Sequence, residues 1–180
     1  MKIQPLFYTT ASGNTIHIRE AKASDAESLI HCIQSYLKNN SIPLTEEEFR
    51  PTIDEQVNWV NTFIHNKNDL LLIAECNGYI IGNIDLKMQH RKMLAHTGII
   101  GMGIHPDWQG QGIGTVLIER IIAWADTNVA VEILWLQVFS TNERAIKFYA
   151  KMGFHEEGRQ RRFIKNIHGE YIDNVIMVRS

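Results

Sequence analysis

Three glycines alternate with larger residues in the stretch QGQGIG at residues 109–114, directly before a strongly periodic apolar run. The first turn of a helix leaves backbone N–H groups without partners and carries a partial positive charge, and side chains there would hold an anion at a distance. Glycines remove those side chains. The spacing therefore predicts that backbone amides near Gly110, Gly112 and Gly114 surround a phosphate or diphosphate at the start of a helix over residues 114–126.

Two familiar nucleotide-binding loops match this stretch poorly. The phosphate loop of NTPases requires a Lys after its last glycine, whereas Thr115 follows Gly114. A dinucleotide-binding fingerprint has G-x-G-x-x-G spacing near the first strand of its domain, but here the spacing is G-x-G-x-G after about four expected strands. A nucleotide-binding module of another class stays an alternative, which a thermal-shift assay with ATP would test.

The elements that must position this loop follow from periodicity and turn signals. Alternating apolar residues predict a half-buried strand at residues 15–20, and Asn77-Gly78 predicts a tight turn between two further strands. S/T-x-x-E pairs that begin at Ser24, Thr52 and Ser140 predict the starts of three helices. The remaining patterns predict strands at residues 70–75, 79–88, 97–104 and 132–139, and a final hairpin of residues 161–167 and 170–178.

Composition and charge limit the class of protein. The 180 residues are 44% hydrophobic and 21% charged, which is typical of one folded domain, expected over residues 1–180. A net charge of -2 does not suggest nucleic-acid binding, and no apolar run is long enough for a membrane span. The two cysteines are expected to be small buried residues. We expect a cytoplasmic protein that binds neither nucleic acid nor membrane, and no metal, because the histidines lack ligand spacing.

The glycine stretch resembles the acyl-CoA-binding loop of the GNAT superfamily of N-acetyltransferases, whose pattern is Q/R-x-x-G-x-G/A. Residues 109–114 match every specified position, and residues 104–106 are similar to the V-x-P that commonly precedes the loop. The segment LQVFSTNERAIKFYAKMGF, residues 136–154, matches the strand, N-x-x-A, Tyr and G-F spacing that follows it. The similarity covers about residues 15–178. It implies an α/β (α+β) fold: a mixed, mostly antiparallel sheet of six to seven strands, splayed at its centre, with helices on both faces.

The resemblance implies acetyl-CoA as the acyl donor and assigns its contacts. The diphosphate is expected at backbone amides of residues 110–115, with a hydroxyl from Thr115. Main-chain groups of Met102 and Ile104 are expected to pair with the pantetheine arm as an added strand does, and an amide near Ile104 to stabilise the oxyanion. The expected donor-binding residues are Met102, Gly103, Ile104, Gln109, Gly110, Gln111, Gly112, Ile113, Gly114, Thr115 and Asn142.

Two of the matched residues have a second interpretation. Periodicity alone places Tyr149 on an apolar helix stripe as a core aromatic residue, whereas its family position implies a general acid that protonates the departing CoA thiolate. Asn142 matches the family asparagine that contacts the pantetheine or the phosphates, and it also lies where a helix cap is needed. One amide can serve both purposes.

The general base is not fixed by the sequence. A lysine-like amine with a pKa of about 10.4 needs more help to lose its proton at neutral pH than an α-amine with a pKa near 8. Glu75, Asp85 and His96 lie on or beside strands that could border the acceptor side. For each of the three, a structural or surface role is the competing interpretation.

The resemblance implies an N-acetyltransferase that moves an acetyl group to a primary amine by direct attack in a ternary complex, because neither cysteine matches a nucleophile position. A catalytically inactive CoA-binding sensor on the same fold is the alternative. The acceptor, a small-molecule amine or a protein amino group, stays open, and so does a homodimer. Residues 39–67 and 160–172 are expected to border the acceptor entrance.

Overall fold

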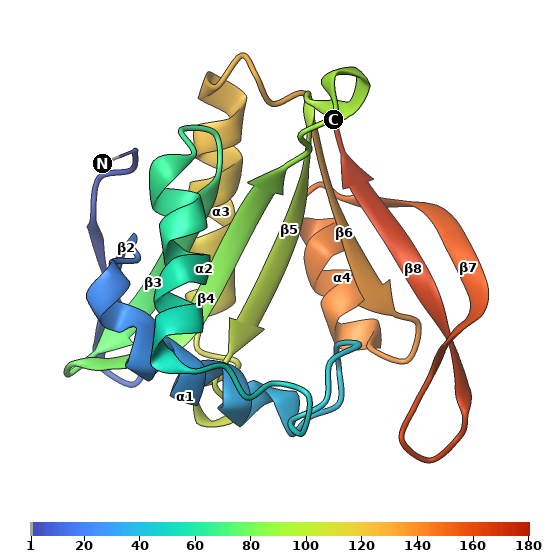
Figure 1. Cartoon of the computed structure of the whole chain (residues 1–180), viewed down its shortest axis with the longest axis horizontal. Helices are drawn as coiled ribbons and strands as arrows, with labels where there is room; N and C mark the ends of the chain where they lie inside the picture. The colour runs from blue at the N-terminus through green and yellow to red at the C-terminus, as the bar shows by residue number, and fades with distance from the viewer. Residues whose placement is uncertain (1) are drawn as a thin grey trace.

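The computed structural model describes residues 2–180, and its framework is an eight-stranded sheet (Figure 1). The strands lie in the order β1-β2-β3-β4-β5-β6-β8-β7, and neighbouring strands are antiparallel except β5 and β6. Their bounds are β1 (Leu6–Thr9), β2 (Thr15–Glu20), β3 (Leu70–Cys76), β4 (Tyr79–Met88), β5 (Thr97–Ile104), β6 (Ile133–Phe139), β7 (His155–Lys165) and β8 (Tyr171–Arg179).

The expectation of six to seven strands is corrected to eight, because β1 adds a strand at one edge of the sheet. The segment LFYT is too short to show a periodic pattern, and its strand geometry comes from pairing with β2, in which Tyr8 lies opposite Ile16. The other seven strands lie where the sequence predicts them, although β7 begins earlier, at His155. The mixed, mostly antiparallel sheet is confirmed.

Helices cover both faces of the sheet, as expected. Buried side chains of α1 and α2 pack with those of β3 on one face, whereas α3 and the buried part of α4 pack on the other. The helices are α1 (Ala26–Leu37), α2 (Ile53–His65), α3 (Ile113–Thr127) and α4 (Glu143–Lys151), and the short 3-10 turns are η1 (Ala23–Asp25), η2 (Lys92–Leu94) and η3 (Pro106–Trp108).

Of the three helix caps predicted from the sequence, one is confirmed. Thr52 and Glu55 form the predicted reciprocal box at the start of α2. The Ser24 cap is wrong, because the Asp25 carboxylate accepts the Lys22 amide at 2.7 Å and starts the 3-10 turn before α1. The Ser140 cap is also wrong: α4 begins two residues later, and Asn142 is its cap.

The centre of the sheet opens between β5 and β6. These strands pair only over three positions, from Thr97 opposite Ile133 to Ile99 opposite Trp135, and then diverge with α4 between them (Figure 1). On its other side β5 stays paired with β4 as far as Ile104. Residues 100–104 therefore present backbone groups toward a gap that β6 does not close.

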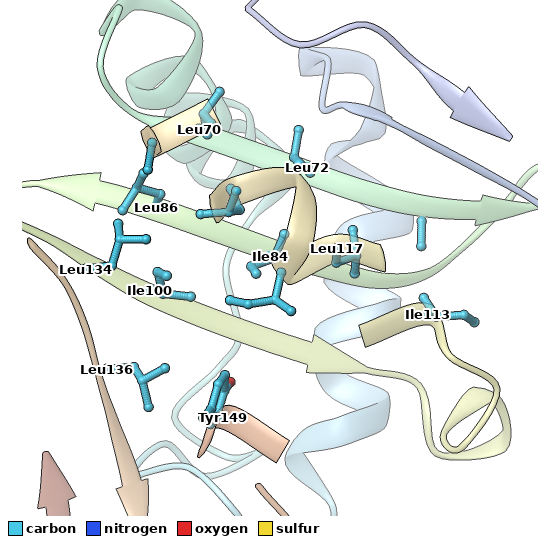
Figure 2. Packing of buried hydrophobic residues seen from close by; sticks show 14 of the residues in the cluster. Leu70, Leu72, Ile84, Leu86, Ile100, Ile113, Leu117, Leu134, Leu136 and Tyr149 are labelled. Atoms are coloured by element: carbon cyan, nitrogen blue, oxygen red, sulfur yellow. The ribbon is translucent and has the colours of Figure 1, made fainter. Parts of the chain in front are cut away.

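The larger core cluster surrounds this opening. Leu117 from α3, Leu72 from β3 and Ile84 from β4 are fully buried together, and Tyr149 extends from α4 toward the same cluster (Figure 2). One side of the opening is thus the packed face of the sheet. Within residues 2–180 we find no helix with both the length and the apolar character to cross a bilayer.

Candidate active site

A cavity of about 530 Å³ lies where β5 and β6 diverge, and it brings together segments distant in the sequence. Its walls come from β5, β6, α4, the loop before α3 and the connection between α1 and α2, which runs across this end of the molecule in Figure 1. Ten of the eleven expected donor-binding residues line it: Met102, Gly103, Ile104, Gln109, Gly110, Gly112, Ile113, Gly114, Thr115 and Asn142.

The glycine loop delivers unpaired amides to this cavity. Gly110 and Gly112 have φ values of 78° and 81°, a left-handed backbone that L side chains rarely adopt. Gly112 is the N-cap of α3 and offers no side chain as a cap, and the first turn contains no acidic residue. The N–H groups that open α3 therefore face the cavity without a competing protein anion, which suits a bound phosphate.

Arg144 adds a positive charge that the sequence analysis did not single out. It lines the cavity from the first turn of α4, and its Nη2 atom lies 3.7 Å from where a Cβ of Gly110 would stand. Its Nη1 atom is 3.5 Å from the Gln109 side-chain oxygen. Arg144 sits inside the N-x-x-A stretch, but only the approach of α4 to the glycine loop turns it into a candidate phosphate ligand.

The open side of β5 forms the wall between the loop and the centre of the sheet. Gln109 donates its side-chain amide to the Ile104 carbonyl at 3.2 Å, which ties the start of the loop to the end of the strand. A Cβ on Gly103 would overlap the Tyr36 ring, so only glycine lets Tyr36 approach the strand this closely. Tyr36 also lines the cavity and hydrogen-bonds Asn83 at 3.2 Å.

Tyr149 lies in α4 at the inner end of the cavity and is 8% exposed. Its ring packs edge-on against Phe148 and Phe154, with centroids 5.1 and 5.8 Å away. Burial raises the pKa of the Tyr149 hydroxyl, and the negative charge of Asp85 raises it further. Tyr149 is thus both a core aromatic residue and a cavity residue, and its hydroxyl holds its proton over the whole physiological range.

Asn142 forms the cap of α4 and also lies at the cavity. Its side-chain oxygen accepts the Ala145 amide at 3.1 Å, which caps α4, and the residue also lines the cavity. The cap fixes the oxygen in place. The amide nitrogen of Asn142 is then the atom suited to a ligand.

Gln111 is the one expected donor-binding residue that does not line the cavity. Its backbone carbonyl accepts the Tyr8 hydroxyl at 2.9 Å, and its side-chain oxygen accepts the Ser12 hydroxyl at 3.0 Å. The side-chain amide donates to the Asp107 carbonyl at 3.2 Å. Gln111 therefore faces the hairpin of β1 and β2.

Of the three base candidates, Asp85 lies nearest to the cavity wall. Asp85 is opposite Gly101 in the β4–β5 register, and a Cβ on Gly101 would lie 2.8 Å from the Asp85 carboxylate. Gly101 itself lines the cavity. Burial raises the pKa of Asp85 from 3.8 to about 7, against the opposing effect of Lys87.

The structure does not bring Glu75 and His96 to the cavity. The Glu75 carboxylate is 2.7 Å from an Arg19 guanidinium nitrogen, and Arg19 also pairs with Asp25. His96 directly precedes β5, whereas Ile104 is the last residue of that strand. The His96 carbonyl accepts hydrogen bonds from the amides of Glu132 and Ile133. None of the three base candidates lines the cavity itself, but Asp85 lies against Gly101, which does.

The two segments expected to border the acceptor entrance contribute fewer residues to the cavity than predicted. From residues 39–67, only Asn39, Ser41 and Ile42 line it, and the hairpin at residues 160–172 contributes none. The hairpin extends away from the opening beside β6 in Figure 1.

Across residues 2–180 we find no group of three or more His, Cys, Asp and Glu residues arranged to hold a metal ion.

Comparison with known proteins places the chain in a family. The model of the acetyltransferase (GNAT) family matches residues 33–154, which is more than half of the chain. A crystal structure of a GNAT-family acetyltransferase from Streptococcus pneumoniae is 29% identical, with a TM-score of 0.87 over 91% of this chain and 98% of that one. A phosphinothricin acetyltransferase from Sinorhizobium meliloti in complex with AcCoA, at 21% identity and a TM-score of 0.77, covers 90% of this chain and 86% of its own and shares the fold.

Curated relatives differ in the acceptor that their names state. The L-amino acid N-acetyltransferase AaaT of Escherichia coli is 31% identical over 60% of this chain and 66% of its own length. Spermidine N(1)-acetyltransferase of the same organism is 32% identical over 53% of this chain and 50% of its own. The chain thus spans between half and two thirds of the length of these relatives. By the family model and the shared architecture, the chain belongs to the GNAT family of acetyltransferases.

Proposed function

We propose that the protein transfers an acetyl group from acetyl-CoA to a primary amine, by direct attack of the amine in a ternary complex. The observation that carries the proposal is the single cavity that joins the uncapped start of α3, the open edge of β5 and the hydroxyl-bearing ring of Tyr149. Family membership supports the reaction class. The start of α3 suits a diphosphate, and the edge of β5 suits an arm that carries amides. Tyr149 then lies where a thioester at the end of that arm would be.

The donor residues have separate tasks in this proposal. Amides of residues 112–115 and the Arg144 guanidinium bind the diphosphate, and the unpaired edge of β5 at residues 100–104 pairs with the pantetheine amides. These contacts place the thioester near Tyr149. Holding donor and acceptor together supplies much of the rate, because a bimolecular encounter becomes a reaction between aligned groups.

The proton transfers then fall to two side chains with different tasks. The amine nitrogen attacks the thioester carbon, a C–N bond forms and the C–S bond breaks. Asp85, directly or through water, accepts the proton that the amine loses, and Tyr149 donates a proton to the thiolate of CoA. The products are an N-acetylated amine and CoA with a free thiol, so protons and electrons balance without a metal.

The cysteines support direct attack over an acyl-enzyme. Cys32 and Cys76 are buried, and neither lines the cavity. Burial raises the pKa of the Cys32 thiol to about 12, so it is a poor nucleophile at neutral pH. Initial-rate kinetics should accordingly show a sequential pattern, and conversion of both cysteines to Ser should leave turnover in place.

A screen of acceptors with acetyl-CoA tests the proposal. Free amino acids, spermidine and peptides with free amino termini are supplied in turn, release of the CoA thiol is followed, and mass spectrometry identifies the product. Thiol release that depends on an amine, with a mass gain of one acetyl group, supports the proposed function. Tight CoA binding without thiol release for any acceptor class would instead favour the inactive sensor.

A further inference from the structure

The N-terminal hairpin of β1 and β2 contacts the glycine loop from the side opposite the cavity. Tyr8 from β1 donates its hydroxyl to the Gln111 carbonyl at 2.9 Å, across more than a hundred residues of chain. Tyr8 does not line the cavity, and its ring packs partly buried against the main core cluster. β1 also lies outside residues 33–154, the range matched by the family model.

The geometry of a peptide unit gives this contact a consequence for the anion site. The carbonyl of Gln111 and the N–H of Gly112 belong to one planar trans peptide, so they point in opposite directions. Tyr8 holds the carbonyl on the side of the hairpin. The Gly112 N–H is therefore directed to the other side of the loop, where Gly112 lines the cavity.

Within the loop, the Gln111 side chain bonds the Asp107 carbonyl, but no bond from the loop itself holds the peptide between Gln111 and Gly112. Gly110 and Gly112 both adopt left-handed φ values, and glycine populates either sign of φ readily, so rotation of the peptide units between them meets little steric resistance. Fixing such a backbone costs conformational entropy. An external contact that fixes it before the ligand arrives removes that cost from binding.

The hairpin is suited to serve as this external contact. β1 is held in antiparallel pairing with β2 along its whole length, from Leu6 opposite Ile18 to Thr9 opposite Thr15. A second bond, from the Ser12 hydroxyl to the Gln111 side chain, comes from the turn of the same hairpin. The Tyr8 hydroxyl also lies 2.3 Å from where a Cβ of Gly112 would stand, so only glycine at that position permits the contact.

We propose that Tyr8 is a positioning residue for the diphosphate-binding loop, which orients the Gly112 N–H toward the bound diphosphate through its hydrogen bond to the Gln111 carbonyl. The inference rests on the proposed function, because it assigns the loop to the diphosphate of CoA. It differs from a purely structural role of Tyr8 in one respect. Loss of the hydroxyl must weaken ligands that contain the diphosphate and spare those that lack it.

Tyr8→Phe removes the hydroxyl and keeps the packed ring. The test compares the dissociation constants of CoA, by calorimetry, and of pantetheine, by NMR titration, since pantetheine carries the thiol arm without the diphosphate. We expect Tyr8→Phe to weaken CoA binding roughly two- to tenfold, the range for one lost hydrogen bond, and to leave pantetheine binding unchanged. Tyr79→Phe, which removes an exposed hydroxyl at the β3–β4 turn, is the matched control and should change neither constant.

The outcomes separate the inference from the proposed function. Unchanged CoA affinity in Tyr8→Phe, or an equal loss for CoA and pantetheine, would overturn the role of Tyr8 while the proposed function stands. Failure of the unmodified protein to bind CoA would overturn both. The unfolding temperature of ligand-free Tyr8→Phe is measured alongside, so that a general loss of folding is recognised by its equal effect on both ligands.

Discussion

Asp85 and Tyr149 both hold their protons more tightly than free side chains do, and burial is the main cause for each. The two groups also interact, because the charge of ionised Asp85 raises the pKa of Tyr149 further. A carboxylate with a pKa of about 7 is poised to accept a proton at neutral pH. A phenol with a raised pKa stays fully protonated there and so holds a proton for the thiolate, while the same shift makes it a weaker acid. The residues thus suit complementary steps of one reaction.

Tyr149→Phe tests the acid. The variant keeps the packing against Phe148 and Phe154 but has no proton for the thiolate. We expect kcat to fall by roughly 100-fold or more, the usual contribution of a positioned acid, with little change in CoA affinity. Steady-state kinetics and calorimetry measure the two. Equal kcat values for the variant and the parent across the pH range would remove Tyr149 from the mechanism.

Asp85→Asn tests the base through the pH dependence of the rate. Because Asp85 must be ionised to accept a proton, kcat should rise with pH through about 7 and then level off, and the raised pKa of Tyr149 predicts no fall at moderately alkaline pH. In the variant kcat should drop roughly 100-fold at pH 7 and lose this dependence. Glu75→Gln is the control and should keep the parent profile, since the Glu75 carboxylate pairs with Arg19 and does not lie against a cavity residue as Asp85 lies against Gly101. An identical profile in Asp85→Asn would show that another group is the base.

Asp85→Asn should also change how the free energy of unfolding depends on pH, and the direction of that change follows from the raised pKa of Asp85. Asp85 ionises near 3.8 when unfolded and near 7 when folded, so between these values the unfolded chain has lost the proton and the folded chain retains it. The free energy of unfolding contributed by Asp85 therefore decreases as pH rises from about 4 to about 7. Urea unfolding at several pH values should show this decrease in the parent and not in Asp85→Asn.

At the scale of elements, the glycine loop is shaped by β1 as well as by α3. Gly112→Ala places a methyl group 2.3 Å from the Tyr8 hydroxyl in a backbone of φ 81°, whereas Gly110→Ala meets strain of the same kind but no atom closer than 3.7 Å. We expect both variants to weaken CoA binding, and Gly112→Ala to weaken it more. Calorimetry of the two variants provides the comparison.

A double variant separates the steric part of this effect from the backbone part. In Tyr8→Phe the atom closest to the new methyl group becomes the ring carbon that bore the hydroxyl, at 3.2 Å, and most of the overlap disappears. Gly112→Ala should therefore cost less CoA affinity in the Tyr8→Phe background than in the parent. Additive losses would mean that the backbone strain alone governs the loop.

At the scale of the molecule, the cavity joins two halves of a sheet whose strands β5 and β6 pair over only three positions. A ligand that fills the opening contacts β5, α3 and α4 together and should stabilise the folded chain as a whole. At a CoA concentration of 100 times its dissociation constant, the unfolding temperature should rise by roughly 5 to 10 °C. ATP is the control in the thermal-shift assay, and a larger rise with ATP than with CoA would favour a different nucleotide ligand.

Local patterns in the sequence determined most of the elements and the glycine loop. Period and turn signals located seven strands and four helices, because each pattern reflects which side chains face the core within one segment. The glycine spacing predicted the loop, since positive φ and exposed amides are local requirements. The short strand β1 escaped prediction because its conformation depends on pairing with β2.

Only the tertiary structure decided which side chains meet. It turned Gln111 away from the cavity and toward Tyr8, brought Arg144 to the glycine loop, and placed Asp85 against Gly101 while Glu75 paired with Arg19. Each of these contacts joins residues far apart in the chain, so no local pattern contains it. The sequence specified most of the residues that line the cavity, and the divergence of β5 from β6 made the space in which they meet.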